Sequence, residues 1–565
     1  MIPPARKKPG GRGRRPTFFS YHRPSARQYD CTFAHKICYI QSKKTRTEPF
    51  AVGTIDITAY SECASNGDPL PRYAKHTSQL AIAVWPLRDC MPLKRIENMI
   101  DLSESFELLN KIREIDNAMI SSKDFSTNYE IQLQPNDKGI KFTLLHDSFL
   151  FKHEKWDFRD LEINQNDLKI KIPYLYLTEK TGGHVNGSIP AFEYGNFNKE
   201  KSKYHRLALP LNEKINFTFS VENVLIDYNY KSGIHTREAT EIKINGHTFH
   251  FYLAKKKITE FSDRDYLVLE SKAPMSYSDF SEFCFSILIS FGFVSGNFIN
   301  NDGYFFQYEN ISMTEVAGIA YRQMRGSIKC QYVPTYSNPF GYIHDTKKAD
   351  LYKDNVRTLN LKEFSNLCQY CHENDDIKSI LLLLIEVHTQ TLVSAPGILS
   401  IALETLANVI YEENESTLAP IKTKSISRKF RKELLNTLDN FQDKIDAEGK
   451  EILKSRINQI NQRTNRDKLL IPFKILKIPI SSTDIEAIEQ RNAFLHGRTP
   501  MIQEIEPKCI NEADKFRYYL YLKLYVLVSS IIMKYIGYDN LVVNYPKIYE
   551  KDTGIELDEE YYRQI

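Results

Sequence analysis

An abrupt change of pattern near residue 360 constrains the fold of this 565-residue chain more than any other feature. Residues 31 to about 350 are rich in β-branched and aromatic side chains that roughly alternate, which is the pattern of half-buried strands. After residue 360, apolar side chains recur instead at helical spacing. We therefore expect an α+β chain, in which a β-rich N-terminal domain is followed by an all-α helical bundle.

The β-rich part contains several segments that suit strands and one clear hairpin. The expected strands are residues 50–60, 79–85, 168–177 and 215–226. Apolar side chains alternate on both sides of Asn245-Gly246, and this dipeptide supplies the positive φ angles that a two-residue turn needs. One helix, at about residues 277–291, is expected to interrupt the strands.

Six segments of the second part suit helices, and prolines fall between them. The expected helices are residues 377–393, 398–411, 427–445, 449–460, 483–498 and 512–535. Helices are expected to end at the intervening prolines, which are Pro396, Pro420, Pro472 and Pro500.

The two ends of the chain differ in charge from its body. The formal net charge is +4, but six basic side chains fall within residues 1–16, and without them the net charge is −2. A nearly neutral body excludes a cationic surface over a whole domain. The sequence predicts a disordered basic tail at residues 1–30, a β-rich domain at 31–350, a helical domain at 365–545 and a solvated acidic tail at 546–565.

Cysteine usage and hydropathy predict a cytoplasmic protein. The nine cysteines are scattered, and the N-terminal residues lack the apolar stretch of a secretion signal. The most apolar window, residues 524–533, is too short to cross a bilayer and suits a buried helix. We therefore expect no association with a membrane.

The helix expected at residues 483–498 carries the candidate site. Thr483 and Glu486 have the spacing of a capping box, and the glycine and proline that follow mark the end of the helix. At about 100° per residue, one stripe about 80° wide should be buried, and it contains Ile485, Ile488, Asn492 and Leu495.

Arg491 and His496 flank this stripe, about 140° apart around the helix. Imidazole titrates near neutrality, so His496 can take a proton from a ribose 2′-hydroxyl or give one to a leaving oxygen. The guanidinium of Arg491 can meet phosphate oxygens and stabilise a pentavalent transition state, and Asn492 can hold the imidazole or the phosphate. The alternative is a histidine at a helix end beside an arginine in a structural salt bridge.

The segment from Arg491 to His496 resembles the Arg-polar-x-x-x-His signature of HEPN ribonucleases, with a four-residue spacer. Glu404 resembles the acidic position in an earlier helix of the Apea-like HEPN group, and the β-rich part is similar to the N-terminal domain of ApeA-type anti-phage proteins. The resemblance implies a homodimer or a higher homo-oligomer formed through the HEPN domain. It also implies RNA cleavage without a metal or cofactor, with two Arg–His pairs at the dimer seam.

The resemblance further implies a role in abortive infection, in which host RNA is cut and a phage-derived trigger acts on the N-terminal domain. The RNA substrate is left open, with tRNA as one candidate. Two other hypotheses remain. One is a binding protein whose bundle only dimerises, and the other is a toxin with a built-in inhibitory domain.

A basic stretch in the helical part is a second candidate for RNA contact. Residues 422–477 contain fifteen basic and seven acidic side chains. Four basic residues stand close together: Arg428, Lys429, Arg431 and Lys432. The stretch suits either an RNA backbone or a solvated helix face.

One motif suggests a metal or haem, and we expect neither. Cys368-x-x-Cys371-His372 has the pattern of c-type haem attachment, but that chemistry requires export. As half of a zinc site the motif lacks a second pair nearby. Cys31, His35 and Cys38 more readily suit an edge strand than a set of ligands.

Overall fold

The structure, a computed structural model, describes residues 95–115, 117–122, 129–136, 139–144, 157–165, 168–181, 184–211, 224–230, 233–255, 265–300, 302–335, 357–491 and 510–565. The predicted tail at 1–30, the strands expected at 50–60 and 79–85, and the triplet Cys31, His35 and Cys38 lie outside these residues. Residues 86–565 form one compact unit.

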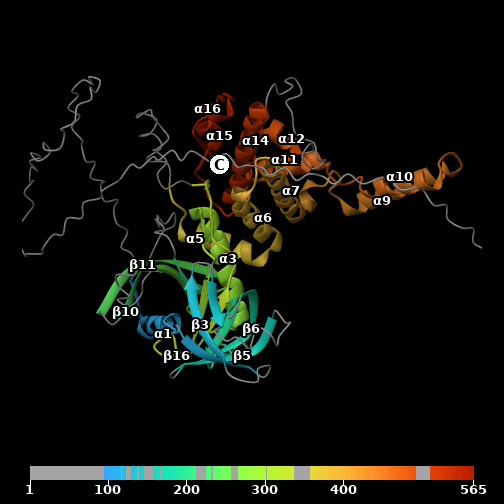
Figure 1. Cartoon of the computed structure of the whole chain (residues 1–565). Helices are drawn as coiled ribbons and strands as arrows, with labels where there is room; N and C mark the ends of the chain where they lie inside the picture. Colours follow the sequence, from blue (N-terminus) through green and yellow to red (C-terminus); the bar gives the residue numbers. More distant parts are fainter. Residues whose placement is uncertain are drawn as a thin grey trace, which may run out of the picture. The chain divides into compact units, whose positions relative to one another are not determined.

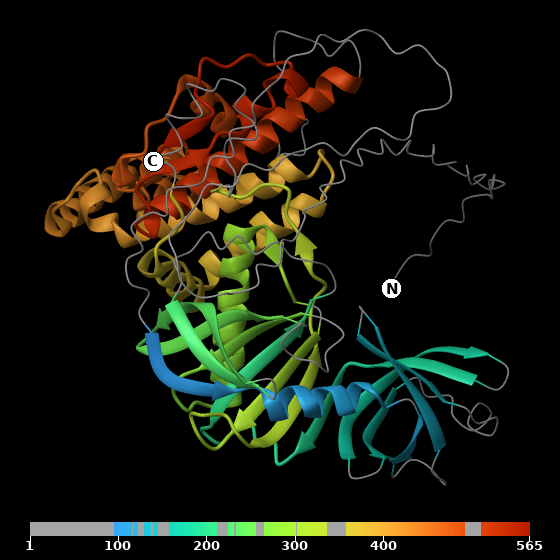
Figure 2. The same cartoon turned by 90° about the vertical axis from the view of Figure 1, so that its left-hand side faces the viewer.

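Fifteen strands form one sheet in the first half of the described chain (Figures 1 and 2). The strands are β1 Arg95–Asp101, β2 Asn117–Ser122, β3 Tyr129–Asn136, β4 Gly139–Leu144, β5 Asp157–Gln165, β6 Leu168–Thr181, β7 His184–Ile189, β8 Ala191–Gly195, β9 Tyr204–Pro210, β10 Val224–Tyr230, β11 Gly233–Ile244, β12 His247–Ala254, β13 Tyr266–Ser271, β15 Asp302–Tyr308 and β16 Val316–Gln323. Their order is β1-β10-β11-β12-β13-β9-β15-β16-β8-β6-β5-β2-β3-β4-β7. The β1–β10 pair is parallel and the other pairs are antiparallel.

One end of the sheet closes on itself. β7 pairs with β4 and also with β6, so that β6, β5, β2, β3, β4 and β7 form a ring of strands. Alternate side chains of these strands are buried in a common core, among them Ile131, Phe142 and Ile172. The helix α1, Ser103–Arg113, contributes Phe106 and Leu109 to the same core.

The predicted hairpin is confirmed. β11 and β12 pair in antiparallel register from Ile244 and His247 outward. Asn245 and Gly246 have φ angles of 49° and 79°, which are the two positive values that the tight turn requires. The strand expected at 168–177 lies within β6, and the part of 215–226 that is described begins β10 at Val224.

The predicted interrupting helix is α3, Tyr277–Ser295, which is longer than expected. The Ser276 side chain accepts a hydrogen bond from the Asp279 amide at its start, and Gly296 ends it with φ of 75°. Most of its side chains are buried, because it packs against β9 on the sheet and against two helices of the second half.

The second half is helical, and its helices differ in part from those predicted. They are α5 Leu361–Glu373, α6 Asp375–Glu386, α7 Ala395–Glu413, α8 Glu415–Leu418, α9 Lys424–Asp439, α10 Ala447–Asn458, α11 Asn465–Leu476, α12 Ser482–Glu489, α14 Ile510–Tyr535, α15 Tyr545–Ile548 and α16 Glu550–Thr553. α5 and α11 were not expected. The predicted break at Pro472 is wrong, since this proline lies inside α11, where the neighbouring Ile471 and Phe473 are buried. Tertiary packing there outweighs the poor helix propensity of proline.

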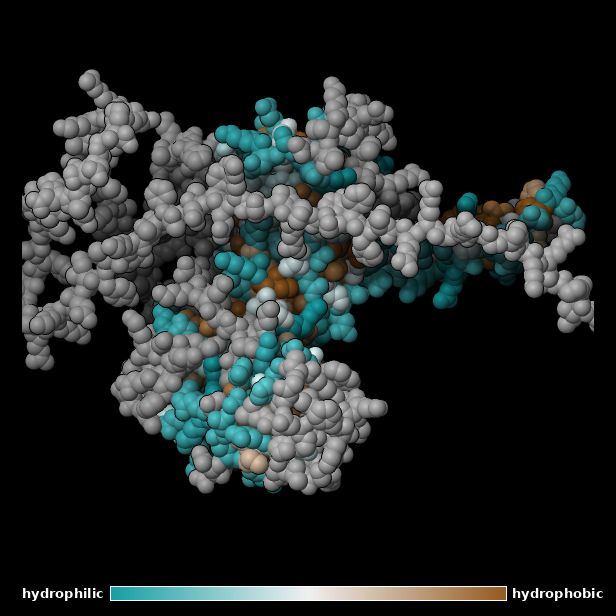
Figure 3. Space-filling model, in the orientation of Figure 1, coloured by the Kyte–Doolittle hydropathy of each residue, from teal (hydrophilic) through white to brown (hydrophobic). Residues whose placement is uncertain are grey.

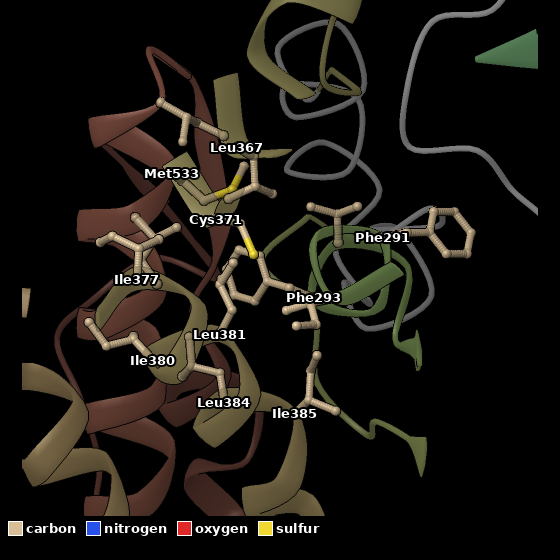
Figure 4. Close-up of a cluster of buried hydrophobic side chains, with 14 of the residues drawn as sticks. Phe291, Phe293, Leu367, Cys371, Ile377, Ile380, Leu381, Leu384, Ile385 and Met533 are labelled. Carbon is tan, nitrogen blue, oxygen red and sulfur yellow. The ribbon is translucent and has the colours of Figure 1, made fainter. Parts of the chain in front are cut away.

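Sheet and helices share one hydrophobic core. α3, α5, α6 and α14 meet around Phe293, Leu381 and Met533 (Figure 4). The same core includes Phe249 and Phe251 of β12. The Lys243 amide of β11 also donates to Ser365 Oγ of α5, at 3.1 Å. The structure confirms the α+β class, and the change from strands to helices occurs within one continuous core.

The C-terminal residues are packed, although the sequence predicts a solvated acidic tail. β19, Tyr562–Gln564, pairs with β18, Leu541–Val543, and Ile565 is buried. Another small pair joins β14, Asn297–Phe298, to β17, Ile328–Lys329. Two acidic side chains near the end have basic partners: Glu550 pairs with Lys547, and Glu559 pairs with Lys523.

Two helices are long and apolar enough to cross a membrane. They are Tyr277–Ser295 and Glu512–Tyr535, and 67% and 83% of their most apolar windows are buried inside the protein. Burial of that extent is typical of core helices in a soluble protein, and the shared core above accounts for their composition.

Candidate functional site

The N-cap of α12 lies two residues before the predicted cap, Thr483. Ser481 is the N-cap: its hydroxyl accepts from the Asp484 amide at 3.2 Å, and the Asp484 carboxylate accepts from the Ser481 amide at 2.8 Å. The predicted Thr483–Glu486 capping box is therefore wrong. Thr483 donates instead to Glu559 at 3.0 Å, and Glu486 is exposed.

The buried face of α12 is also rotated from the predicted stripe. Asp484, Ala487, Ile488 and Arg491 are buried, whereas Ile485 is only half-buried. α12 ends at Glu489, earlier than predicted, and Arg491 is buried just beyond its C-cap, Gln490. The pattern of apolar residues misplaced the buried face because it includes a charged side chain, Asp484, whose partners are basic.

Arg491 and Glu404 lie together just beyond the end of α12. Glu404 projects from α7, and its carboxylate forms an ion pair with the Arg491 guanidinium. The Arg491 side chain is 7% exposed, and the Glu404 side chain is 35% exposed. Asn492, Leu495 and His496 lie outside the described residues, so the structure does not place the predicted Arg–His pair.

A pocket of about 540 Å³ lies beside Arg491. It is lined by Asn465, Arg466 and Leu469 of α11, by Ile488 and Glu489 of α12, and by Arg491 itself. Arg466 forms an ion pair with Glu489, and both side chains are well exposed. Two guanidinium groups therefore border one hollow, an arrangement suited to a phosphate.

The sequence interpretation missed Asn465 and Arg466, although a signal was present. Thr464 is the N-cap of α11, and its hydroxyl accepts from the Asp467 amide at 3.2 Å. Thr464-x-x-Asp467 has the spacing of a helix start. The expectation that Pro472 ends a helix concealed this helix.

A buried charge cluster anchors the other end of α12. Lys523 of α14 is 1% exposed and lies 2.9 Å from Asp484 Oδ1 and 2.6 Å from Glu559 Oε1. Arg563 Nη2 lies 2.8 Å from Asp484 Oδ2. Burial raises the pKa of Asp484, but Arg563 and Lys523 outweigh burial and hold this pKa below its ordinary value. The C-terminal segment thereby fixes α12, the helix that ends just before Arg491.

The predicted RNA-binding residues lie away from the pocket. Arg428, Lys429, Arg431 and Lys432 belong to α9, and none of them lines the pocket. α9 and α10 pack against each other as a two-helix hairpin, which we call the basic arm, Lys424–Asn458 (Figure 1).

The cysteine motif is part of the hydrophobic core. Cys368 and Cys371 are buried on α5, and burial raises the pKa of the Cys371 thiol to about 12. The His372 ring stacks on Phe283, with ring centroids 4.1 Å apart. Among the residues that the structure describes, no three metal-binding side chains come together. The thiols are held protonated, so they suit packing better than nucleophilic chemistry.

No protein-family model, curated protein or solved structure matches the chain.

Proposed function

We propose that the chain is a metal-independent HEPN endoribonuclease that acts in the cytoplasm in bacterial anti-phage defence. The observation that carries the proposal is the placement of Arg491. Its guanidinium is nearly enclosed, is held by Glu404 from a second helix, and lines a pocket that Arg466 also borders. A guanidinium held in this way keeps a fixed orientation toward a phosphate in the pocket.

In this mechanism the RNA supplies its own nucleophile. His496 takes the proton of a ribose 2′-hydroxyl, and the 2′-oxygen attacks the adjacent phosphorus. The bond from phosphorus to the 5′-oxygen breaks, and that oxygen takes up a proton. Arg491 stabilises the charge on the phosphoryl oxygens, while Asn492 orients the imidazole or the phosphate. The products are a 2′,3′-cyclic phosphate and a 5′-hydroxyl.

In this proposal the β-rich part acts as a sensor or regulator. α3 packs against the sheet on one side and against α5 and α6 on the other. A phage-derived trigger that binds the sheet could therefore alter the helical part through one shared core. Release of an inhibitory domain by simple separation would expose that core, which argues against the built-in inhibitor.

A homodimer through the helical part completes the proposal, and its contact face is proposed on the outer side of α7. Ile488 is 2% exposed within the single chain, so it is not free to contact a partner. On the outer side of α7, Ile401 is 47% exposed and lies one turn before Glu404. Val393, just before α7, is 61% exposed. An Ile401→Asp variant of the full chain should sediment as a monomer if this face joins two copies. An unchanged dimer would exclude the face.

The decisive experiment is end-group analysis of RNA incubated with the purified full chain in EDTA. We expect cleavage that leaves 2′,3′-cyclic phosphate and 5′-hydroxyl ends, and that is blocked by a single 2′-deoxy sugar at the cut site. His496→Ala should abolish it, and Arg491→Lys should slow it by roughly 100- to 1,000-fold, because lysine lacks the planar fork. His184→Ala and Arg325→Lys, which alter a surface histidine and a surface arginine, serve as controls.

Two results would refute this mechanism. Products with 5′-phosphate ends, or activity that EDTA removes and Mg²⁺ or Mn²⁺ restores, would indicate metal-dependent hydrolysis. Full activity of the His496→Ala variant would remove the proposed proton carrier. In cells, growth arrest by the wild type but not by His496→Ala would separate a nuclease from a protein that only binds.

A further inference from the structure

Most side chains of the basic arm are exposed. No residue of α10 is buried, and in α9 only Ser427 and Leu438 are buried. The arm projects from the other helices, with brown apolar side chains gathered along one flank and teal polar ones along another (Figure 3). A hairpin of this kind contributes little to the core, so its composition needs another explanation.

The charge of the arm is unbalanced on α9. This helix carries five basic and two acidic side chains. Lys424, Arg428 and Lys432 are spaced four residues apart, so they line one side of a helix that is about 24 Å long. Arg431 and Lys429 lie on either side of this row. Within the residues that the structure describes, none of these five forms an ion pair.

Two of the three basic residues of α10 behave differently. Lys450 Nζ lies 2.9 Å from Asp439 Oδ1, which ties the two helices together, and Lys454 Nζ lies 2.9 Å from Glu451 Oε1. Carboxylates of the arm thus pair with Lys450 and Lys454, while the row on α9 is left with its charge. A row of uncompensated cations is complementary to a polyanion.

The arm also carries two exposed aromatic rings. Phe430 is 41% exposed and lies on the side of α9 away from the row, whereas Phe441 is 47% exposed and follows the end of α9. The Lys444 ammonium lies 5.8 Å from the centre of the Phe441 ring. Basic side chains together with exposed rings are the surface on which unpaired bases stack while the backbone is held.

The arm also leads to the pocket. α10 ends at Asn458, and α11 begins at Asn465, which lines the pocket with Arg466. We propose that the basic arm binds single-stranded RNA, with the row on α9 along the phosphates, and so directs the strand toward Arg491. The direction toward a cleavage site rests on the proposed nuclease function, whereas RNA binding by the arm does not.

The test measures RNA binding without cleavage. The probe is a fluorescein-labelled single-stranded RNA that is methylated at every 2′-oxygen, so that attack by the 2′-oxygen is blocked. Its affinity for the full chain is measured by anisotropy between about 50 and 200 mM KCl. The variant Lys424→Gln/Arg428→Gln/Lys432→Gln should lower the slope of log affinity against log salt by about 2. The matched control Lys378→Gln/Lys450→Gln/Lys454→Gln removes the same charge from lysines that already have carboxylate partners, and its slope should stay near that of the wild type.

The remaining outcomes are also decisive. Equal slopes of log affinity against log salt for the wild type and both variants would overturn the proposal. An equal decrease of the slope in both variants would also overturn it, because the effect would then come from net charge and not from contact with the row. If the variant with the three α9 substitutions no longer sediments as a dimer but binds RNA as the wild type does, the arm is assigned to contact with a second copy of the chain. If the chain binds phosphatidylserine vesicles but gives no anisotropy change with the RNA, the arm is assigned to a membrane surface. If unmethylated RNA is never cut but the arm still binds RNA, the nuclease function fails and the arm proposal stands.

Discussion

Two buried arginines, one in the sheet and one in the helical part, differ in what surrounds them. Arg206 of β9 is fully buried, and its nitrogens donate to Glu270 at 2.6 Å, to Ser105 at 2.5 Å, to Tyr308 at 2.9 Å and to the Asp101 carbonyl at 2.8 Å. Glu270 is fully buried as well. All three guanidinium nitrogens of Arg206 are therefore bound within the protein.

Arg491 is enclosed almost as completely but has a different kind of partner. Its ion-pair partner is Glu404, whose side chain is 35% exposed, and the Arg491 guanidinium itself lines a pocket. Burial alone therefore does not indicate function. A functional arginine needs an orienting partner on one side and an accessible space on the other, and only Arg491 of these two has both.

The largest expected effect is the loss of stability in an Arg206→Met variant. Methionine removes the charge and leaves the buried Glu270 carboxylate without its cation. Removal of one partner from a buried pair costs about 3–5 kcal/mol of unfolding free energy. We expect a loss of this size from urea unfolding of the full chain at neutral pH. Arg491→Met should cost clearly less, because water can reach Glu404.

A double variant sharpens this result. Arg206→Met/Glu270→Met replaces both charges with apolar groups, so it should recover most of the lost stability. Equal losses for the Arg206 and Arg491 single variants, or a double variant no better than the single, would contradict the distinction between the two arginines.

An intermediate effect is expected at Asp484, which is enclosed like Arg206 but lies on α12, the helix that ends just before Arg491. Asp484→Asn keeps the shape and removes the charge that Lys523 and Arg563 share. Loss of a hydrogen-bonded charge costs about 1.5–3 kcal/mol. The same substitution should weaken RNA cleavage less than Arg491→Lys does, since the cluster only positions α12.

The pH dependence of stability tests the same cluster. The folded protein holds the pKa of Asp484 and of Glu559 below their ordinary values of 3.8 and 4.5. Groups with lowered pKa stabilise the fold above their ordinary pKa, and this contribution is lost as the pH falls through the folded-state pKa. Wild-type stability should therefore fall steeply below about pH 4.5, and Asp484→Asn should flatten that fall. A variant with an unchanged slope would place the acid sensitivity elsewhere.

Local signals in the sequence were sufficient for some elements. The Asn245-Gly246 hairpin is determined by two adjacent residues and by alternation on either side of them, so the pattern alone predicts it. α3 was predicted for a similar reason, because its apolar run is continuous. The change from strands to helices near residue 360 also depends only on local periodicity.

The buried face of α12 could not be predicted in this way. Asp484 on this face is neutralised by Lys523 and Arg563, and Arg491 just beyond the helix is neutralised by Glu404, and all three partners are distant in the sequence. An argument from apolar periodicity treats charged residues as exposed, so the buried face was predicted too close to Ile485. Glu404 was found only through the resemblance to HEPN proteins. Pro472 shows the same limit for helix breaks, since packing around α11 decides the outcome.

The smallest effect on stability is expected at Arg466. Its side chain is 71% exposed and its partner Glu489 is 44% exposed, so solvent screens the pair. Exposed pairs contribute about 0.2–1 kcal/mol, and Arg466→Ala should change the unfolding free energy by no more than that. Arg325→Ala is the matched control, because Arg325 pairs with Glu386 at 2.5 Å, is 54% exposed and does not line the pocket.

The two variants should differ in RNA cleavage although they agree in stability. If the pocket receives the phosphate, Arg466→Ala should raise KM several-fold with little change in kcat, because an exposed guanidinium contributes mainly to ground-state binding. Arg325→Ala should change neither constant. Equal kinetics for both variants would mean that the pocket beside Arg491 does not hold the substrate. In that case an enclosed arginine with a partly exposed carboxylate would be as structural as Arg206, and the distinction between the two arginines would fail.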